Sequence, residues 1–391
     1  MKTEMEQDTL VIFLEGNISS ENSKETEREI QEALDAHPEQ PFLFDADRLE
    51  YITSAGLRVL LRFQKQNMEK ITVRNLSAEL YEIFDMTGFT VLMNCRKKLR
   101  TVDVEGCEVI GVGAVGTVYR MDEDTIVKVY GDEFTLEMIE NERDMSRKAF
   151  LRGIPTAIPF DVVRVGDSIG AVYEMVKARN GNDYLRDHPE EAEKISRDYA
   201  EFLRTVHAVE CDPGELEDIR RKYLRDLDEI RDLLPEETCA KAGALIESVP
   251  ESLHIVHGDI HLKNVMLTED GMMLIDMDTL SCGQPIFDFA ALFVTYVAFG
   301  EVDHDNPKQF LGIDRETVVR VFELTTRFYL KPKNEEEYRA AVDRISVPGY
   351  VRYLRLQKLY GPDDPELRER CISHAVGRLR ELTDRLTDLN L

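Results

Sequence analysis

The sequence predicts two domains: an α/β unit with a mixed sheet over residues 1–94, and a larger α+β unit over residues 106–391. Strand and helix patterns alternate through the first unit, which favours a mainly parallel or mixed sheet covered by helices. In the second unit, β-forming segments fill residues 106–177, and helical patterns dominate residues 178–391. A chain of 391 residues also exceeds what one hydrophobic core usually organises.

The elements of the first unit follow from its apolar spacing. Apolar runs predict strands at Leu10–Leu14, Pro41–Phe44 and Ile71–Val73. Amphipathic spacing predicts helices at Ser20–Ala36, about Ala55–Met68 and Ala78–Phe84. We expect Ser20 or Glu21 near the cap of the first helix and a loop over Asp45–Thr53 before the second.

Two motifs of this unit carry a family resemblance. The segments YITSAGLRVLL at 51–61 and IFDMTGF at 83–89 are similar to a STAS domain of the anti-sigma-factor-antagonist type. The resemblance implies that a serine beside the helix start is phosphorylated by a partner kinase, and that the phosphate breaks the complex with an anti-sigma factor. Ser54 falls at that position, although Thr53 stands where an Asp often precedes the serine.

Ser54 has two readings that can hold together. As a helix N-cap it would bond a free N–H of the first turn, worth about 1 kcal/mol. As a phosphorylation site it would carry about −1.5 to −2 charges at a helix N-terminus, which tolerates them. Such a charge in a docking face repels an acidic or apolar partner without unfolding the domain.

A charged linker is expected at residues 95–105, followed by a glycine-rich segment, VIGVGAVGTVYR. A dinucleotide-binding fold needs a helix directly after such glycines. Here β-forming residues follow instead and lead through a turn to a strand that contains Lys128. The segment therefore resembles the small lobe of protein kinases. The resemblance assigns nucleotide binding to a set of residues, Gly111, Gly113, Gly116 and Val118, with Lys128 on the α and β phosphates.

The lysine needs an acidic partner, and a helix expected from about Phe134 to Leu151 offers Glu137, Glu140 and Glu142. The resemblance favours Glu142, which precedes the apolar end of that helix. Next comes an antiparallel strand pair, Phe160–Val165 with Ala171–Met175. Glu174 and Val176 then lie where a hinge would bring backbone groups to the adenine.

The stretch IVHGDIHLKNVMLTEDGMMLIDMD, residues 255–278, is the chemical centre of the second unit. Its apolar runs predict a β-hairpin with a turn at Glu269–Gly271, so that Asp259, Asn264 and Asp276 meet at one edge. Phosphoryl transfer from ATP needs a carboxylate that accepts the hydroxyl proton. It also needs an amide oxygen and a second carboxylate that hold Mg²⁺.

The pattern H-G-D-x-x-x-x-N followed by I-D resembles the catalytic and metal loops of aminoglycoside phosphotransferases and choline-kinase-like enzymes. The resemblance implies a bilobal kinase-like fold, with Asp259 as the catalytic base and Asn264 and Asp276 as metal ligands. His257 is expected to be structural. Gly258 stands where most protein kinases have the Arg of H-R-D.

Asp288 is expected to begin a helix after the metal loop and to brace the backbone of the catalytic loop. Only 11 residues separate Asp276 from Asp288, and the A-P-E motif of a protein-kinase activation segment is missing. The apolar stretch Phe287–Phe299 is too short to span a bilayer and is expected to be a buried helix. Helices are also expected at Pro189–Val209, Gly214–Leu234, Glu236–Ser248, Arg315–Tyr329, Glu335–Ile345, Tyr350–Tyr360 and Pro365–Leu389.

The composition limits the partners. A net charge of −27 argues against nucleic acid or an anionic membrane as a direct partner. The six cysteines form no C-x-x-C pair, so neither a zinc site nor a disulfide framework is expected. The N-terminal residues have no apolar signal region, and we expect a cytoplasmic protein.

Three functions remain open. The first is a Mg-ATP-dependent phosphotransferase that acts on a small-molecule hydroxyl and uses the STAS domain for regulation or docking. The second is a protein serine kinase whose substrate is a STAS serine such as its own Ser54. The third is a non-catalytic, ATP-gated anti-sigma factor antagonist, against which Lys128, Asp259, Asn264 and Asp276 weigh because all four are present.

Overall fold

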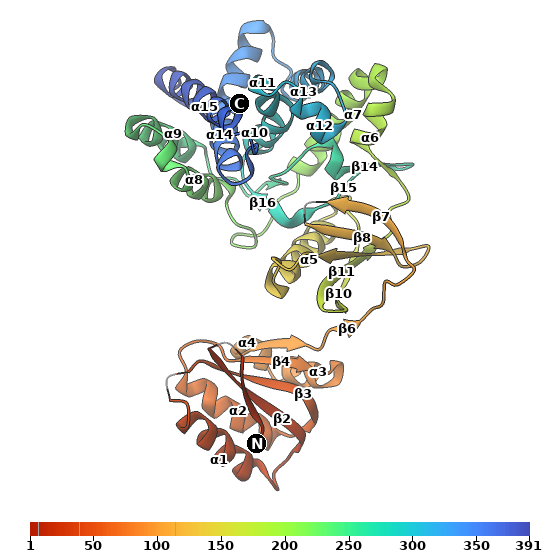
Figure 1. Ribbon diagram of the computed structural model, residues 1–391, viewed down its shortest axis with the longest axis vertical. Helices are drawn as coiled ribbons and strands as arrows, with labels where there is room; N and C mark the ends of the chain where they lie inside the picture. The colour runs from red at the N-terminus through yellow and green to blue at the C-terminus, as the bar shows by residue number, and fades with distance from the viewer. Residues whose placement is uncertain (7, 39, 114) are drawn as a thin grey trace. The chain divides into compact units, whose positions relative to one another are not determined.

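A computed structural model describes residues 1–6, 8–38, 40–113 and 115–391. The chain divides into two compact units, Met1–Asp103 and Val104–Leu391. Both contain strands and helices, and the expected fold classes are confirmed (Figure 1). Within the described residues, no helix is long and apolar enough to cross a membrane.

Unit 1 is a five-stranded mixed sheet with the order β1-β2-β3-β4-β5. Its strands are β1 Thr3–Glu6, β2 Thr9–Ile18, β3 Phe42–Ile52, β4 Thr72–Leu76 and β5 Asn94–Lys97. β1 runs antiparallel to β2, and the other neighbours are parallel. Its helices are α1 Ser23–Asp35, α2 Ser54–Gln66, α3 Ala78–Met86 and α4 Phe89–Leu92. Apolar residues of β2, β3, β4 and the helices form one buried core.

Three details of unit 1 differ from expectation. The loop expected over Asp45–Thr53 is instead the second half of β3, because pairing with β2 continues to Ile52 and buries apolar residues along the way. The cap of α1 is Asn22 rather than Ser20 or Glu21. The expected linker 95–105 is partly strand, since β5 includes its first three residues and β6, Arg100–Thr101, follows.

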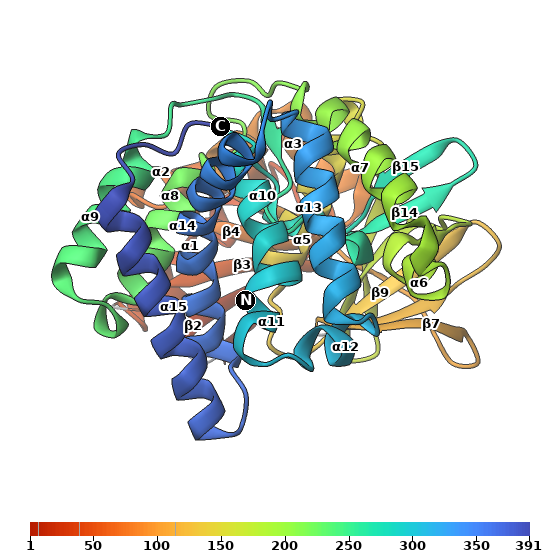
Figure 2. The same cartoon turned by 90° about the horizontal axis from the view of Figure 1, so that it is seen from above.

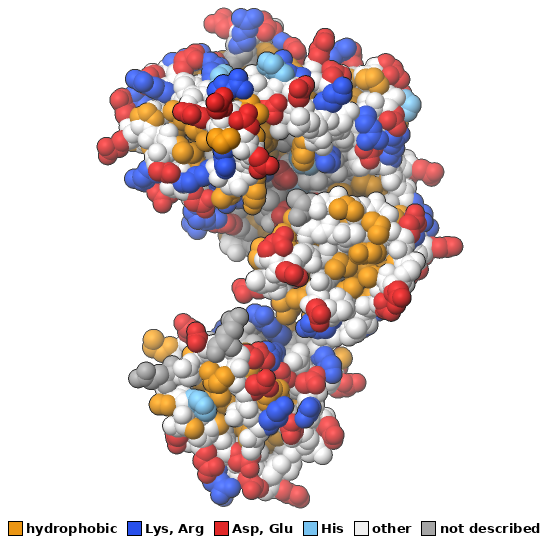
Figure 3. Space-filling model, viewed as in Figure 1, with side chains coloured by type: hydrophobic (Ala, Val, Ile, Leu, Met, Phe, Trp, Pro, Cys, Tyr) orange, Lys and Arg blue, Asp and Glu red, His pale blue; other side chains and the backbone are white. Residues whose placement is uncertain are grey.

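Unit 2 opens with an antiparallel sheet in the order β10-β11-β9-β8-β7. The strands are β7 Glu108–Gly113, β8 Gly116–Arg120, β9 Thr125–Tyr130, β10 Pro159–Val165 and β11 Ser168–Glu174. Helix α5, Leu136–Leu151, packs against β10 and β11. We call these strands and α5 the small lobe. Apolar side chains of β7 are exposed, and hydrophobic side chains gather over this part of the lobe in Figure 3.

The large lobe is the helical remainder of unit 2. Its helices are α6 Gly181–Asp187, α7 Ala192–His207, α8 Ile219–Glu229, α9 Glu236–Ser248, α10 Ile286–Phe293, α11 Phe299–Val302, α12 Asn306–Leu311, α13 Arg315–Leu330, α14 Glu335–Tyr360 and α15 Pro365–Arg385. α10 is buried at every position and packs on α14, while α7 and α13 lie side by side (Figure 2). A π-helical turn, Val294–Ala298, joins α10 to α11, so the apolar stretch 287–299 is helical and mostly buried.

Helix α14 corrects the expectation of two helices, Glu335–Ile345 and Tyr350–Tyr360. One helix runs through Pro348. Proline removes one backbone hydrogen bond and normally interrupts a helix. Here tertiary packing outweighs that cost, because Gly349 presses so closely on α10 that a Cβ there would lie 2.6 Å from Phe293.

Two short antiparallel ladders lie within the large lobe. The hairpin of β14, Val265–Thr268, and β15, Gly271–Leu274, pairs at its β14 edge with β12, Arg179–Asn180. β13, Ile255–Val256, pairs with β16, Ser281–Cys282. After the resemblance noted above, we call residues 257–264, which follow β13, the catalytic loop, and residues 275–280, which follow β15, the metal loop. Because β13 pairs with β16 and β14 with β15, the two loops begin and end on neighbouring strands.

Candidate functional site

Lys128 lies at the centre of a three-residue ionic cluster in unit 2. Its Nζ is 2.8 Å from Oε1 of Glu142 on α5 and 2.7 Å from Oδ1 of Asp276 after β15. The side chains of Lys128 and Glu142 are 12% and 9% exposed, whereas that of Asp276 is 43% exposed. Among the three glutamates considered, the structure therefore brings Glu142 to the lysine. The cluster ties the small-lobe sheet and helix to the metal loop.

The charged groups in this cluster shift one another's pKa values. Burial by itself would lower the pKa of Lys128, but the nearby carboxylates of Asp276 and Glu142 outweigh burial and raise it. Burial raises the pKa of Glu142, an effect that Lys128 opposes. Both pKa values are raised, which favours the charged form of the lysine and disfavours the charged form of the glutamate. We take the lysine as charged because two carboxylates contact it within 3 Å.

The backbone of Asp276 has a positive φ, which is unusual for a residue other than glycine. Its φ is 59° and its ψ 69°, in the left-handed region that few residues other than glycine adopt. Such conformations persist where the surrounding structure requires them and cluster at functional sites. A short 3-10 helix, Met277–Thr279, follows directly and packs against α5.

The glycine-rich segment forms the β7–β8 hairpin beside Lys128. Val118 of β8 is half-buried and lies opposite Lys128 of β9 in the ladder. Gly111 and Gly113 are in β7, and Gly116 begins β8. Only Gly116 is sterically required, since a Cβ there would lie 2.0 Å from a main-chain oxygen of β9. Residue 114 lies outside the described residues.

The expected hinge lies at the end of β11. The main-chain N–H of Glu174 donates to Ile158 O at 2.9 Å, and its Oε2 accepts from Ile158 N at 3.2 Å. The N–H of Val176 makes no hydrogen bond with a described residue, whereas its carbonyl accepts from Ala178 N at 2.9 Å. Among the described residues, the N–H of Val176 therefore has no acceptor, and it lies next to the sheet that carries Lys128.

Asp288 holds the backbone of the catalytic loop. It is fully buried on α10, and it accepts from the N–H groups of His257 at 3.0 Å and Gly258 at 2.6 Å. Nε2 of His207 lies 2.9 Å from the same carboxylate. Burial alone would raise the pKa of Asp288, but His207, His257 and the Gly258 amide outweigh burial and lower it.

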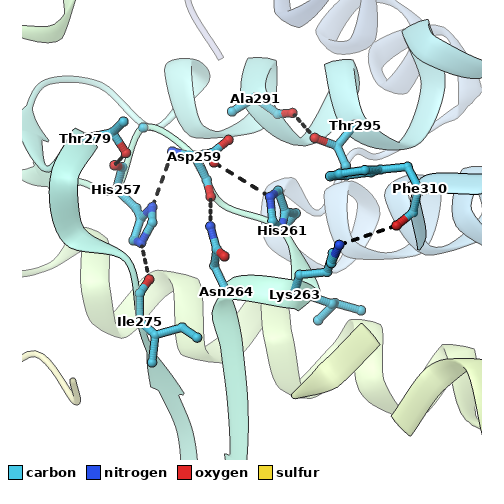
Figure 4. Close-up of polar contacts among 12 residues, drawn as sticks. His257, Asp259, His261, Lys263, Asn264, Ile275, Thr279, Ala291, Thr295 and Phe310 are labelled. Carbon is cyan, nitrogen blue, oxygen red and sulfur yellow. Dashed lines mark hydrogen bonds and ion pairs between the residues drawn. The ribbon is translucent and has the colours of Figure 1, made fainter. Parts of the chain in front are cut away.

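His257 and Gly258 connect the catalytic loop to the metal loop. Nε2 of His257 contacts Ile275 O at 3.1 Å, and its carbonyl accepts from Thr279 Oγ1 at 2.7 Å (Figure 4). Gly258 has φ of 82°, and a Cβ there would lie 2.8 Å from Thr279 O. Glycine therefore fits this backbone where an arginine side chain would not.

Asp259 follows Gly258 in the catalytic loop and has polar contacts on several sides. Nδ2 of Asn264 donates to its main-chain oxygen at 3.0 Å, and Nε2 of His261 lies 3.7 Å from Oδ2 (Figure 4). Arg352 of α14 donates to Oδ1 at 2.7 Å and to Gly258 O at 2.6 Å. Partial burial would raise the pKa of Asp259, but the charge of Arg352, followed by the histidines, outweighs burial and lowers it.

The hairpin β14–β15 brings Asn264 and Asp276 to the same edge. The N–H of Ile275 donates to Asn264 O at 3.0 Å, so the two residues stand at facing strand ends. Oδ1 of Asn264 and Oδ2 of Asp276 have no hydrogen-bond donor among the described residues. The site thus contains two groups: Lys128 with Glu142 and Asp276, and Asp259 with Asn264.

The oxygen atoms at this edge suit a hard cation. Mg²⁺ prefers oxygen ligands, and it usually takes one or two protein carboxylates with phosphates and water as the others. Asn264 and Asp276 provide an amide oxygen and a carboxylate oxygen. In the described part of the chain, no group of three or more His, Cys, Asp or Glu could hold a metal alone.

Ser54 belongs to unit 1, whereas the residues described above belong to unit 2. It is the first residue of α2 and is exposed. The expectation that it caps the helix is wrong, because Thr53 is the N-cap residue and Ser54 already lies in the first turn. Its hydroxyl is consequently available to solvent at a helix N-terminus.

Several charged residues near Asp259 were missed by sequence reasoning. Asp278 stands two residues after Asp276 in I-D-M-D, so its spacing could have indicated it. Arg352 lies 93 residues after Asp259, and no local pattern connects them. Lys222 and Asp226, on α8, also escaped notice because α8 reads as an ordinary amphipathic helix.

Each of the two units matches a known protein family or domain. The profile of the phosphotransferase enzyme family, APH, matches residues 106–337, and a STAS domain profile matches residues 1–94. The chain is 34% identical over 83 residues to BtrV of Bordetella bronchiseptica, provisionally named an anti-sigma factor antagonist. That match covers 20% of this chain and 71% of BtrV.

Solved structures with a similar arrangement include the ADP-bound aminoglycoside phosphotransferase APH(2'')-Ib, with 18% identity and a TM-score of 0.48. That match covers 79% of this chain and 99% of the other. A choline/ethanolamine kinase family protein from Mesorhizobium loti has 15% identity and a TM-score of 0.44, covering 71% and 87%. Because the family profile matches more than half of the sequence, the chain belongs to the phosphotransferase enzyme family and carries a STAS domain before its phosphotransferase domain.

Proposed function

We propose that the chain is a Mg-ATP-dependent phosphotransferase that acts on the hydroxyl group of a small molecule, with the STAS domain as a regulatory or docking module. The observation that carries the proposal is the contact of Lys128 with both Glu142 and Asp276. A lysine held by a helix carboxylate and placed next to a metal-loop carboxylate is the arrangement that phosphoryl transfer requires. Family membership supports a phosphotransferase and leaves the acceptor to be assigned.

The nucleotide side of the site belongs to the small lobe. Lys128 binds the α and β phosphates, and Glu142 keeps its ammonium group in place. The amides around Gly111, Gly113 and Gly116 approach the phosphates, and Gly116 allows the close approach of two backbones that a side chain would prevent. Val118 packs against the adenine, for which Glu174 and Val176 supply the hinge, Val176 through its free N–H.

The transfer itself takes place at Asp259. The acceptor oxygen forms a bond to the γ-phosphorus, the bond from that phosphorus to the β–γ bridging oxygen breaks, and ADP leaves. The acceptor hydroxyl gives its proton to Asp259, which also orients it for attack. Asn264 and Asp276 would hold Mg²⁺, which supplies positive charge that neutralises the phosphate oxygens as the bond breaks.

Charge explains why the cation is needed. Two unit charges about 4 Å apart interact by roughly 4 kcal/mol at an effective dielectric constant near 20. Asp259 and Asp276 would therefore repel the phosphates of ATP by several kcal/mol. Lys128 offsets part of this repulsion, and the cation would offset the rest.

The proposal is tested by measuring Mg-ATP binding calorimetrically and ADP release with a panel of hydroxyl acceptors. Lys128→Met should weaken Mg-ATP binding at least tenfold, and Asp276→Asn should remove the dependence of ATP binding on Mg²⁺. Lys194→Met is the matched control, because it removes an exposed lysine on α7 that forms an ion pair with Glu191. A wild-type chain that does not bind Mg-ATP would refute the proposal.

A protein serine kinase is the second candidate function, favoured by the exposure of Ser54 at the start of α2. In this reading the acceptor is a STAS serine, and phosphorylation at Ser54 would control the docking of an anti-sigma factor. Incubation with Mg-ATP followed by mass spectrometry distinguishes the two. A phosphate on Ser54 that is lost in Asp259→Asn supports the protein kinase. Unmodified protein that phosphorylates an added hydroxyl compound supports the first function.

A further inference from the structure

Arg352 places a positive charge directly on the residue proposed to activate the acceptor. Its side chain is 15% exposed and extends from α14 to Oδ1 of Asp259 at 2.7 Å and to Gly258 O at 2.6 Å. α14 runs to Tyr360, beyond residue 337 where the family profile match ends. The arginine thus approaches Asp259 from the large lobe.

Lys222 is a second cation on the same side. It lies on α8, which packs against α14, and the two helices are neighbours in Figures 1 and 2. The residue is half-buried and makes no hydrogen bond or ion pair with the described residues. Arg355 of α14 contacts Asp226 of α8 at 3.1 Å, and Lys358 reaches Glu229 O at 2.8 Å, so the two helices run in the same direction at this contact. Lys222 and Arg352, each about one turn earlier on its helix, therefore lie at the same level. Burial and then the charge of Arg352 lower the pKa of Lys222.

The acidic residues around Lys222 are mostly engaged elsewhere. Asp226 contacts Nε of Arg355 at 3.1 Å, and Asp259 is bonded to Arg352. Asp278, in the metal loop, also acts on Lys222 electrostatically, but among the described residues the two form no hydrogen bond or ion pair. An ammonium group that is partly removed from water and has no partner is costly, and a bound anion would relieve the cost.

We propose that Lys222 and Arg352 form an anion-binding site beside Asp259, so that the acceptor is a small hydroxyl compound that carries a carboxylate or phosphate group. The proposal rests on the phosphotransferase function and narrows its acceptor. The anion of the acceptor contacts Lys222, and its hydroxyl reaches Asp259. An acceptor rich in ammonium groups, such as an aminoglycoside, would instead place like charges next to both cations.

The test compares ligands that share one carbon skeleton and differ in charge. Gluconate and glucose 6-phosphate are anionic, glucose is neutral and glucosamine is cationic. Their binding to the full chain is measured by ligand-observed NMR or calorimetry, with and without Mg-ADP, which fills the phosphate side of the site. At least one anion should bind ten times more tightly than glucose and glucosamine. The preference should be present in the complex with Mg-ADP.

Three variants test whether Lys222 causes the preference for anionic ligands. Lys222→Met should weaken binding of the anion about tenfold and leave Mg-ADP binding unchanged, and Lys222→Arg should retain the preference. Lys194→Met removes an exposed surface lysine of α7 and should change nothing. These variants leave the contacts of Asp259 intact, which a change of Arg352 would not.

The outcomes separate this proposal from the one on which it rests. Equal affinity for all four ligands, preference for glucosamine, no measurable binding of either anion, or an unaffected Lys222→Met variant would overturn the anion site. None of these results would contradict the binding of Mg-ATP. A chain that binds the anion through Lys222 but neither binds nor turns over Mg-ATP would contradict the phosphotransferase function instead.

Discussion

Replacing Asp288 by asparagine should destabilise unit 2 and loosen the catalytic loop. The Asp288 carboxylate is fully buried and accepts three hydrogen bonds, from the amides of His257 and Gly258 and from the His207 ring. Asparagine has nearly the same shape but only one acceptor oxygen. If that oxygen takes the place of Oδ2, the new NH₂ group faces the Gly258 N–H, and two donors meet without an acceptor.

The size of the effect follows from the number of bonds lost. A buried donor left without a partner costs about 1–3 kcal/mol. The two remaining bonds lose their charge assistance, which roughly halves each one. Because a neutral amide is easier to bury than a carboxylate, part of this loss is offset. We therefore expect Asp288→Asn to lower the free energy of unfolding by about 2–4 kcal/mol at neutral pH.

The destabilisation should depend on pH with a defined sign. The pKa of Asp288 is lowered in the folded protein, since His207, His257 and the Gly258 amide outweigh burial. A lowered pKa stabilises the folded state above the unfolded pKa, about 3.9, and this stability is lost as the pH falls through the folded pKa. The difference between wild type and Asp288→Asn should therefore be full at pH 7 and shrink below about pH 4.

Urea unfolding followed by near-ultraviolet circular dichroism measures this effect. All 14 tyrosines except Tyr51 and Tyr81 lie in unit 2, and the sequence has no tryptophan, so the signal reports mainly unit 2. Asp198→Asn, an exposed change on α7, is the control and should stay within about 0.5 kcal/mol of wild type. An Asp288→Asn variant as stable as that control, or a deficit that does not shrink in acid, would refute the reasoning.

Three further predictions test the site. Asp259→Asn should reduce the rate of phosphoryl transfer by about 10²–10⁴ while Mg-ATP affinity stays within about twofold of wild type, measured by ADP release and calorimetry; an unchanged rate would exclude Asp259 as the base. Lys128→Met should lower the unfolding free energy of unit 2 by about 3–5 kcal/mol because Glu142 is left buried and unpaired, and adding Glu142→Gln should restore much of it in urea titrations; if the double variant is no more stable than the single one, that explanation is wrong. Gly258→Ala should be less stable than Gly153→Ala, since both have positive φ but only at Gly258 would the Cβ meet a backbone oxygen, at 2.8 Å; equal losses in urea would contradict this steric argument.

The fold class could be predicted because its signals are local. Alternating strands and helices in unit 1, and strands followed by helices in unit 2, are visible in short windows of sequence. The expectations that were wrong concern segments whose secondary structure depends on long-range contacts. Pairing with β2 extends β3 to Ile52, and packing on α10 carries α14 through Pro348. Neither contact leaves a mark in the sequence near the residues that it changes.

Some polar residues of the site could also be predicted from local sequence, and others depend on long-range contacts. Asp259 and Asn264 precede the β14–β15 hairpin and Asp276 follows it, so turn residues and apolar runs within about two dozen residues relate them. Glu142 could be narrowed only to three candidates, because helical spacing alone does not say which glutamate faces the sheet. The contact with Lys128 selects one.

What the sequence by itself determined is the order of elements and the chemical groups of the hairpin, because hydrogen bonding and side-chain alternation in a hairpin act between near neighbours. Only the tertiary structure decided that Arg352 contacts Asp259 and that Lys222 acts on Asp259 from α8 without an ion pair to any described residue. These residues come from helices far apart in the chain. The charges that surround Asp259 are therefore a property of how α8 and α14 pack, which no single segment encodes.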